Sequence, residues 1–398
     1  MPDASPTKWH LAHTTWFFEV FILERFEKNF KPFDDSFRVL FNSYYIGVGD
    51  KFPRAKRGLI SRPDLSRVLA YRENVEARID ALLQQLAHLN ITERKELASL
   101  VELGINHEQQ HQELLLTDLK HLLSQNPLKP AYRDGWPLVR AKSAPATWVD
   151  FEGGLHEIGN GAESFCFDNE TPRHKVYLNA FSLSSLPISH GDVLDFIADG
   201  GYKSPQFWLS MGWDSVQEQA WNAPLYWEQH AGDVQGRNNG WNTFTLRGMC
   251  EISRRVPCPH LSYFEADAIA RWMGARLPRE AEWEIAANAN ASTKHNLLED
   301  NIYHPLELKE GLEPNQLGHL IGDVWEWTQS AYLAYPGFRE APGLVGEYNG
   351  KFMCNQFVLR GGSCVTPSSH IRTSYRHFFP PDARWQFSGA RLAKDIQG

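Results

Sequence analysis

The sequence has 398 residues, which is long enough for two domains that each bury a hydrophobic core. Hydrophobic residues make up 42% and charged residues 22%, as in an ordinary soluble protein, and no apolar run is long enough to span a bilayer. The formal net charge of −8 gives no general reason to expect nucleic-acid binding. The N-terminus lacks the features of a secretory signal, and the five cysteines form no CxxC pair, so we expect reduced thiols and a cytoplasmic location.

Residues 1–126 predict a helical bundle. Ser5-Pro6 predicts a helix start, and the pattern that follows runs unbroken to about Phe26. A long loop, 27–63, separates this helix from the next, and a loop of that length inside a compact domain is usually functional or disordered.

Two further helices are expected in this region. Asp64 is a plausible cap for a helix over 65–89. Asn90-Ile91-Thr92-Glu93 resembles a capping box and opens a third helix, whose apolar positions recur every three or four residues.

The pattern changes after the third helix. Residues 127–147 are rich in Pro and Ala and read as a linker. Residues 148–398 contain many glycines and short apolar runs, in which only 189–201 and 262–289 look helical. We therefore predict the α+β class, with a helical bundle followed by a mixed domain.

The third predicted helix carries His107-Glu108-Gln109-Gln110-His111, the H-E-x-x-H pattern of zinc peptidases. Residues four apart share a helix face, so His107 and His111 can bind one ion. Two histidines do not complete a site, and the metzincin continuation is absent because Leu114 and Thr117 stand where Gly and His are required. A third ligand must come from another helix.

The first helix offers His10 and His13. Only the inward-facing one is expected to reach the bundle core, and His13 is favoured because it lies on the more apolar stripe. Three imidazoles with vacant positions beside them suit iron(II) that binds substrate and oxygen, and they also suit zinc with one water.

The long loop is cationic in its second half. Arg54 and Arg57 lie three residues apart, and they form either a solvated charged turn or a clamp for a carboxylate. The adjacent Tyr44-Tyr45 is either a structural pair or a source of a phenol near the metal.

Together these motifs resemble one enzyme family, across essentially the whole chain. The segments SPTKWHLAHTTWFFE, LFNSYYIGVGDKFPRAKRGLISRP and NHEQQHQELLLTDLKH resemble the DinB-like bundle of the EgtB-type sulfoxide synthases of ergothioneine biosynthesis. The segments RLPREAEWEIAA, GDVWEWTQSAY and LRGGSCVTPSSHIRTSYRHFFPPDARWQFSGARLAKD resemble their C-terminal domain, which is of the formylglycine-generating-enzyme (sulfatase-modifying) type with a C-type-lectin-like core. The resemblance implies a mononuclear non-haem iron(II) enzyme. Such enzymes use O2 to join a thiol sulfur to the imidazole C2 of hercynine (trimethylhistidine), giving a sulfoxide.

The resemblance also implies roles for particular residues. His13, His107 and His111 match the iron ligands, and Gln110 matches a residue near the hercynine imidazole. Arg54 and Arg57 match the arginines that hold the thiol substrate's carboxylate. Tyr44 and Tyr45 match the tyrosine pair of the subgroup that uses free cysteine. The segment that closes over hercynine is matched by His377, Phe378 and Phe379. Aromatic faces attract a quaternary cation, so the two phenylalanines would line the trimethylammonium pocket.

Three departures from the family pattern matter. Relatives usually have a helix before the one that carries His13, so this chain is expected to expose an apolar face and to be poorly soluble unless a partner covers it. His377 replaces the usual asparagine, which leaves selenoneine synthase and ovothiol synthase activities as alternatives. Thr366 and Ile371 occupy the positions of the redox cysteines that formylglycine generation requires, so that activity is rejected.

Two further classes stay open. A zinc hydrolase would use Glu108 as its general base. A non-catalytic bundle joined to a lectin-like binding domain would hold no metal.

Overall fold

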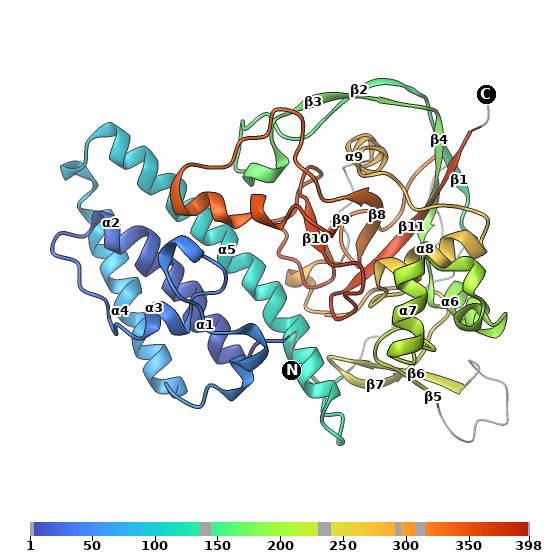
Figure 1. Cartoon of the computed structure of the whole chain (residues 1–398), viewed down its shortest axis with the longest axis horizontal. Coiled ribbons are helices and arrows are strands. Elements are labelled where there is room, and N and C mark those ends of the chain that lie inside the picture. The colour runs from blue at the N-terminus through green and yellow to red at the C-terminus, as the bar shows by residue number, and fades with distance from the viewer. Residues whose placement is uncertain (1–3, 136–144, 230–239, 291–295, 308–314, 397–398) are drawn as a thin grey trace. The chain divides into compact units, whose positions relative to one another are not determined.

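The structure is a computed structural model that describes residues 4–135, 145–229, 240–290, 296–307 and 315–396. The chain divides into two compact units (Figure 1). The first unit comprises Met1–Leu122 and Ala341–Tyr348, and the second comprises Leu123–Glu340 and Asn349–Gly398. The expected linker, 127–147, includes residues 136–144, which lie outside the described residues.

The first unit is helical, as predicted. Its elements are α1 (Thr7–Phe18), a π-helical segment (Glu19–Leu23), α2 (Glu24–Phe26), α3 (Phe37–Leu40), short 3-10 turns at Ile46–Val48, Arg54–Leu59 and Leu86–His88, α4 (Leu65–Gln84) and the long α5 (Ile91–Ser124). The core is built from side chains on α1, the π-helical segment, α4 and α5, including Trp9, Trp16, Phe17, Ile22, Val68, Tyr71, Val75, Leu97 and Leu116.

Two of the predicted helix starts are confirmed. Asp64 accepts the backbone N–H of Arg67 at 2.9 Å and caps α4. Asn90 and Glu93 exchange side-chain-to-backbone hydrogen bonds of 2.9 and 3.0 Å, which is the capping box expected before α5.

The first helical run is continuous to Phe26, as predicted, and it contains a π-helical segment between α1 and α2. One detail of this run was predicted wrongly. Ser5 does not cap it, since no side chain caps α1 and the Ser5 backbone N–H instead donates to the Asp118 carboxylate at 2.8 Å. A π-helical turn is frequent at functional sites, and this one follows directly after the helix that carries His13.

The second unit is built on β-structure, which confirms the α+β class. Within the described residues, one sheet has the order β1-β4-β11-β8-β9-β10, with β8 and β11 parallel and the other neighbours antiparallel. The bounds are β1 (Trp148–Phe151), β4 (Phe181–Pro187), β8 (Trp325–Ala331), β9 (Phe357–Arg360), β10 (His377–Phe379) and β11 (Ser388–Asp395). A hairpin joins β2 (Gly154–Ile158) to β3 (His174–Leu178), and a smaller sheet joins β5 (Trp227–Gln229), β6 (Trp241–Thr245) and β7 (Gly248–Glu251).

Helices of the second unit are α6 (His190–Ala198), α7 (Ser210–Glu218), α8 (Tyr263–Trp272) and α9 (Glu280–Ala289). The expectation that only the segments now seen as α6, α8 and α9 are helical was wrong, because α7 is also present. Its sequence is weakly helix-forming, and tertiary packing supports it. A Cβ on Gly212 would come within 2.9 Å of Phe264, so the glycine permits close contact with α8. Among the described residues, no helix is long and apolar enough to cross a membrane.

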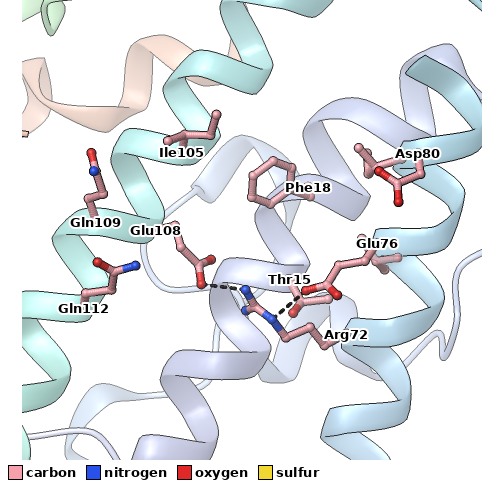
Figure 2. Close-up of a pocket in the computed structure, with 11 residues that line it drawn as sticks. Thr15, Phe18, Arg72, Glu76, Asp80, Ile105, Glu108, Gln109 and Gln112 are labelled. Atoms are coloured by element: carbon pink, nitrogen blue, oxygen red, sulfur yellow. Dashed lines mark hydrogen bonds and ion pairs between the residues drawn. The ribbon is translucent and has the colours of Figure 1, made fainter. Parts of the chain in front are cut away.

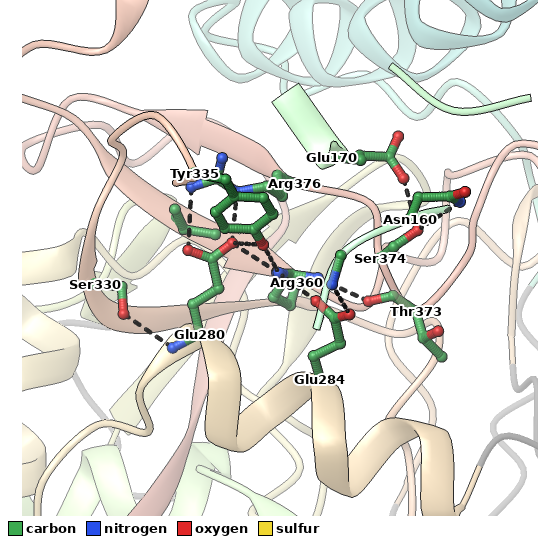
Figure 3. Close-up of polar contacts among 12 residues, drawn as sticks. Asn160, Glu170, Glu280, Glu284, Ser330, Tyr335, Arg360, Thr373, Ser374 and Arg376 are labelled. Atoms are coloured by element: carbon green, nitrogen blue, oxygen red, sulfur yellow. Dashed lines mark hydrogen bonds and ion pairs between the residues drawn. The ribbon is translucent and has the colours of Figure 1, made fainter. Parts of the chain in front are cut away.

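A buried ionic network anchors the strand that carries His377 (Figure 3). Arg360 on β9 contacts Glu280 at 2.7 Å and Glu284 at 2.9 Å, both on α9. Arg376, which directly precedes β10, also pairs with Glu280. Burial alone would raise the pKa of Glu280, but the charges of Arg376 and Arg360 hold it at about 2. The network thereby fixes where β10 begins.

Candidate metal and substrate site

Three histidines from two helices converge in the first unit. His13 lies on α1, and His107 and His111 lie one turn apart on α5. One ligand nitrogen from each residue lies within 4.8 Å of the other two, and all three side chains are buried. The structure therefore brings together the three residues predicted as metal ligands.

The unpartnered nitrogens of this cluster fit a metal. His13 Nδ1 lies 2.6 Å from the Phe41 carbonyl and donates to it, which leaves Nε2 buried and without a hydrogen-bond partner among the described residues. Neither ring nitrogen of His107 has such a partner within the described part of the chain. Buried polar atoms are normally satisfied, so orphaned imidazole nitrogens that face one another suit a transition metal such as iron or zinc.

The charge state agrees with ligation. Burial lowers the pKa of His13 and of His111 well below the ordinary value, and it lowers that of His107 to about 3. All three imidazoles are therefore neutral at physiological pH, which is the form that offers a lone pair to a metal.

One expectation about the first helix was wrong. His10 and His13 are both buried, although only one was expected to reach the interior. His10 lies behind the cluster, with its Nδ1 2.9 Å from His111 Nδ1.

Glu108 of the H-E-x-x-H pattern forms an ion pair with an arginine of α4 (Figure 2). Its carboxylate pairs with Arg72 on α4 at 2.7 Å, and Arg72 in turn pairs with Glu76 at 2.8 Å. Glu108 lines a cavity of about 320 Å³ together with residues of α1, α4 and α5. A carboxylate already paired with an arginine is poorly suited to act as the general base of a zinc hydrolase.

The predicted tyrosine pair belongs to an aromatic cluster that includes a histidine of the site. Tyr44 and Tyr45 stack with ring centroids 4.6 Å apart, and the Tyr44 hydroxyl donates to that of Tyr45 at 3.5 Å. Trp16 joins the pair to the histidines, since its ring lies 5.6 Å from Tyr45 and 5.7 Å from His13. Burial, followed by the neighbouring Tyr44 and Tyr348, raises the pKa of Tyr45 well above its ordinary value, so this phenol keeps its proton.

Tyr348 contacts two residues of the candidate site, and sequence reasoning missed it. It belongs to the first unit, its hydroxyl donates to Gln110 Oε1, and its ring lies 5.8 Å from His107. The adjacent Glu347 accepts the backbone N–H groups of Ile46 and Gly47 at 2.9 and 2.7 Å. No sequence signal identifies this residue, because 238 positions separate it from Gln110.

The two arginines of the predicted clamp differ in environment. Arg57 is buried, with its guanidinium 3.5 Å above the Trp9 ring, and it donates to Ser5 and Ser43 at 3.1 and 3.0 Å. No carboxylate of the described residues forms an ion pair with Arg57, whereas Arg54 is exposed. Burial and the nearby Arg54 lower the pKa of Arg57 to about 9, so it stays charged at neutral pH.

The comparisons with known proteins agree with this geometry. Residues 1–115 match the DinB superfamily, and residues 139–396 match the sulfatase-modifying factor enzyme 1-like domain. Hercynine oxygenase of Mycobacterium tuberculosis is 32% identical over 99% of this chain and 92% of its own length. The chain belongs to the hercynine oxygenase family. It is therefore an enzyme, an oxygen-dependent oxidoreductase, and the expected DinB-like and formylglycine-generating-enzyme-type folds are confirmed.

Other relatives extend the comparison. Hercynine oxygenase of Mycolicibacterium smegmatis is 33% identical over 74% of this chain and 71% of its own. A formylglycine-generating enzyme of Streptomyces coelicolor is 25% identical over 68% of this chain and 95% of its own. Among solved structures, PvdO from Pseudomonas aeruginosa is 17% identical, covers 63% of this chain and 94% of its own, and gives a TM-score of 0.39.

In this chain, the second unit contains the predicted aromatic segment, residues 377–379. Phe378 stacks on Tyr332 with centroids 4.0 Å apart, and Phe379 meets Trp385 edge-on at 5.6 Å. His377 lies 4.8 Å from Trp325, and burial lowers its pKa to about 3. The side chain that replaces the family's asparagine is therefore neutral at physiological pH.

Proposed function

We propose that this enzyme is a non-haem iron(II)- and O2-dependent sulfoxide synthase. It joins the sulfur of cysteine to C2 of hercynine in ergothioneine biosynthesis. The observation that carries the proposal is the cluster of three neutral, buried imidazoles, two of which have unpartnered nitrogens among the described residues, in a chain related to hercynine oxygenases over almost its whole length. A requirement for reduced iron and a reduced thiol suits the proposed cytoplasmic location.

The proposed reaction balances without a further reductant. Cysteine loses its S–H hydrogen, hercynine loses its C2–H hydrogen, and the carbon–sulfur bond forms. One atom of O2 enters the sulfoxide, and the other leaves as water with the two hydrogens. Iron(II) held by His13, His107 and His111 would supply the one-electron chemistry by which O2 oxidises a thiol and an imidazole carbon.

Arg57 is the proposed anchor for the cysteine carboxylate. The charge of Asp118 acts on Arg57 but forms no direct ion pair with it, so a buried cation keeps part of its desolvation cost, which a substrate carboxylate would offset through a bidentate pair. Arg54, the other residue of the proposed clamp, is exposed. It would attract the cysteine carboxylate through its charge, without a direct contact.

Gln110, Phe378 and Phe379 remain the proposed hercynine contacts, with His377 beside them. Gln110 is oriented by the Tyr348 hydroxyl, which fixes its amide for a hydrogen bond to an imidazole. The stacked Phe378 and Tyr332 offer aromatic faces to a trimethylammonium group. A neutral His377 avoids repulsion of that cation.

Tyr44 and Tyr45 are the proposed catalytic phenols. The Tyr45 oxygen accepts the Tyr44 hydroxyl proton, so its own proton is directed elsewhere and can be given to an oxygen in the site. Its raised pKa keeps the phenol protonated at neutral pH, so it would give its proton only to a strongly basic oxygen.

The test is a product analysis. The protein is purified anaerobically, loaded with iron(II), mixed with hercynine and cysteine, and exposed to O2, and the products are identified by mass spectrometry. We expect hercynylcysteine sulfoxide from the native enzyme and none from His107→Ala. Oxygen consumption that yields only cysteine sulfinate would contradict the assigned reaction.

The proposal has a rival in the same chemical class, the formation of a carbon–selenium bond from hercynine and a selenosugar. The presence of histidine at position 377 keeps it open. Competition between cysteine and the selenosugar, with both products measured, separates the two activities.

A further inference from the structure

A chain of buried contacts leads from one histidine of the metal site to a carboxylate. His10 Nδ1 lies 2.9 Å from His111 Nδ1, and His10 Nε2 lies 2.9 Å from Asp118 Oδ2. All three side chains are buried, with exposures of 3%, 9% and 3% for His10, His111 and Asp118. The same Asp118 oxygen accepts the Ser5 backbone N–H at 2.8 Å, which fixes its place.

The local fold explains why these groups meet. Asp118 lies seven residues after His111 on α5, so both project from the same face of one helix. His10 comes from α1, one helical turn before His13, and bridges them. One helix thus carries both ends of the chain of contacts, and the other carries its middle.

Only one arrangement of protons is compatible with metal binding. His111 Nδ1 is occupied by His10, so Nε2 is the nitrogen left to bind a metal, and the His111 proton must sit on Nδ1. That proton is donated to His10 Nδ1, which must therefore be unprotonated. The His10 proton then sits on Nε2 and is donated to the Asp118 carboxylate, which can only accept.

The opposite arrangement excludes the metal. A His10 with its proton on Nδ1 would donate to His111 Nδ1 and move the His111 proton to Nε2, where it would block ligation. Asp118 disfavours this form because His10 Nε2 would then face a carboxylate oxygen with no proton between them. The contact between His10 Nε2 and Asp118 Oδ2 thus selects the useful tautomer of both rings.

We propose that His10 and Asp118 are positioning residues that hold His111 in the tautomer and orientation able to bind the metal through Nε2. The proposal rests on the three-histidine metal site of the proposed function. His13 receives the equivalent support from the Phe41 carbonyl. Outer partners of this kind commonly change metal affinity by about 10- to 100-fold when they are removed.

The experiment measures metal affinity in the full-length protein, not turnover. Apo-protein is titrated anaerobically with iron(II), and with cobalt(II) as a spectroscopic probe, against a chromophoric chelator. His10→Phe keeps a ring of similar size without hydrogen bonds, and we expect it to weaken both metals about 10- to 100-fold and to change the cobalt visible bands. His10→Asn can place an amide oxygen near the lost Nδ1, and we expect it to recover part of the affinity.

Thr15→Val is the matched control. It removes the partly buried hydrogen bond from Thr15 Oγ1 to the Leu11 carbonyl at 2.8 Å on the same helix, a bond that involves none of the histidines. Its metal affinity should equal that of the native protein even if its stability falls. Unchanged affinity in His10→Phe, or an equal loss in Thr15→Val, would overturn the proposal.

A double-mutant cycle tests whether Asp118 acts through His10. Asp118→Ala should weaken metal binding in the native background and have little further effect in His10→Phe, since the two residues form one chain. Equal losses in both backgrounds would overturn the relay. If the native protein binds neither metal, the metal site of the proposed function fails and this proposal fails with it, whereas native binding with unchanged variants rejects the proposal alone.

Discussion

The histidine cluster of the first unit and the ionic network of the second both bury polar groups, but they satisfy them differently. In the network, Glu280 and Glu284 are each paired with arginine, and Tyr335 donates to Glu280 at 2.8 Å. In the histidine cluster, His13 Nε2 and both nitrogens of His107 have no hydrogen-bond partner among the described residues. The nearby Arg57 donates only to the hydroxyls of Ser5 and Ser43 among the described residues, and the charge of Asp118 acts on it without a direct ion pair.

This difference distinguishes buried polar groups that stabilise the fold from buried polar groups that bind a ligand. A buried polar group that contributes only to stability needs its partner within the fold, because leaving it unpaired costs roughly 1–3 kcal/mol or more. A group that waits for a metal or substrate must stay unpaired until the ligand arrives. The following predictions use this contrast, since loss of a network residue should affect stability, and loss of a site residue should affect binding.

The largest expected effect on stability is in the network. Glu280→Gln leaves Arg376 and part of Arg360 without charge compensation, and we expect a loss of about 3–5 kcal/mol in the free energy of unfolding. Denaturant unfolding measures it, with Glu218→Gln on the exposed side of α7 as the control. Iron(II) affinity of the folded variant should be unchanged. A loss of iron(II) affinity without destabilisation would contradict the assignment of Glu280 to a purely structural network.

The same residue predicts a pH dependence. The pKa of Glu280 is about 2 in the folded protein, against an ordinary value of 4.5. Its contribution is therefore fully present above about pH 4.5 and is lost as the pH falls towards 2, because the unfolded chain takes up the proton first. Stability measured over this range should fall more steeply for the native protein than for Glu280→Gln.

Arg57→Met should show the opposite pattern. We expect the KM for cysteine to rise by about 100-fold, because the carboxylate loses a buried guanidinium. The free energy of unfolding should stay the same or increase, since a buried charge without a direct ion pair among the described residues is replaced by an apolar side chain. Arg54→Met, on the exposed side, is the control and should change KM less than threefold. Strong destabilisation by Arg57→Met would show that Arg57 stabilises the fold instead of serving mainly to bind substrate.

A smaller effect is expected at His377. Its imidazole is neutral because burial lowers its pKa to about 3, and His377→Arg would add a fixed positive charge near the proposed trimethylammonium pocket. We expect about a tenfold higher KM for hercynine and an unchanged KM for cysteine, while His377→Asn should behave like the native enzyme. Equal changes in both KM values would point to a general distortion of β10 instead.

The smallest effect on activity is expected at Glu108. Glu108→Gln removes a half-buried pair with Arg72 but touches neither the histidine cluster nor the substrates. Activity should stay within threefold of the native value, and stability should fall by about 1 kcal/mol or less. Loss of all sulfoxide formation in a folded variant would contradict this assignment and place Glu108 in the reaction.

Local signals in the sequence predicted much of the first unit. The caps at Asp64 and at Asn90–Glu93 form as expected, because a cap depends only on residues within one turn of it. The i, i+4 spacing of His107 and His111 placed both on one helix face for the same reason. The resemblance to a family predicts roles for His13, Arg57 and the tyrosine pair, which local signals alone do not provide.

What the sequence determined by itself is thus the family, the helix starts and the residue types of the site. Only the tertiary structure decided that Glu108 turns to Arg72, that Arg57 is buried while Arg54 is exposed, and that Tyr348 meets Gln110. It also showed that His10 joins His111 to Asp118. The physical reason is that helix periodicity and capping act over a few residues, whereas these contacts join segments as far apart as 238 positions and depend on how the whole unit packs.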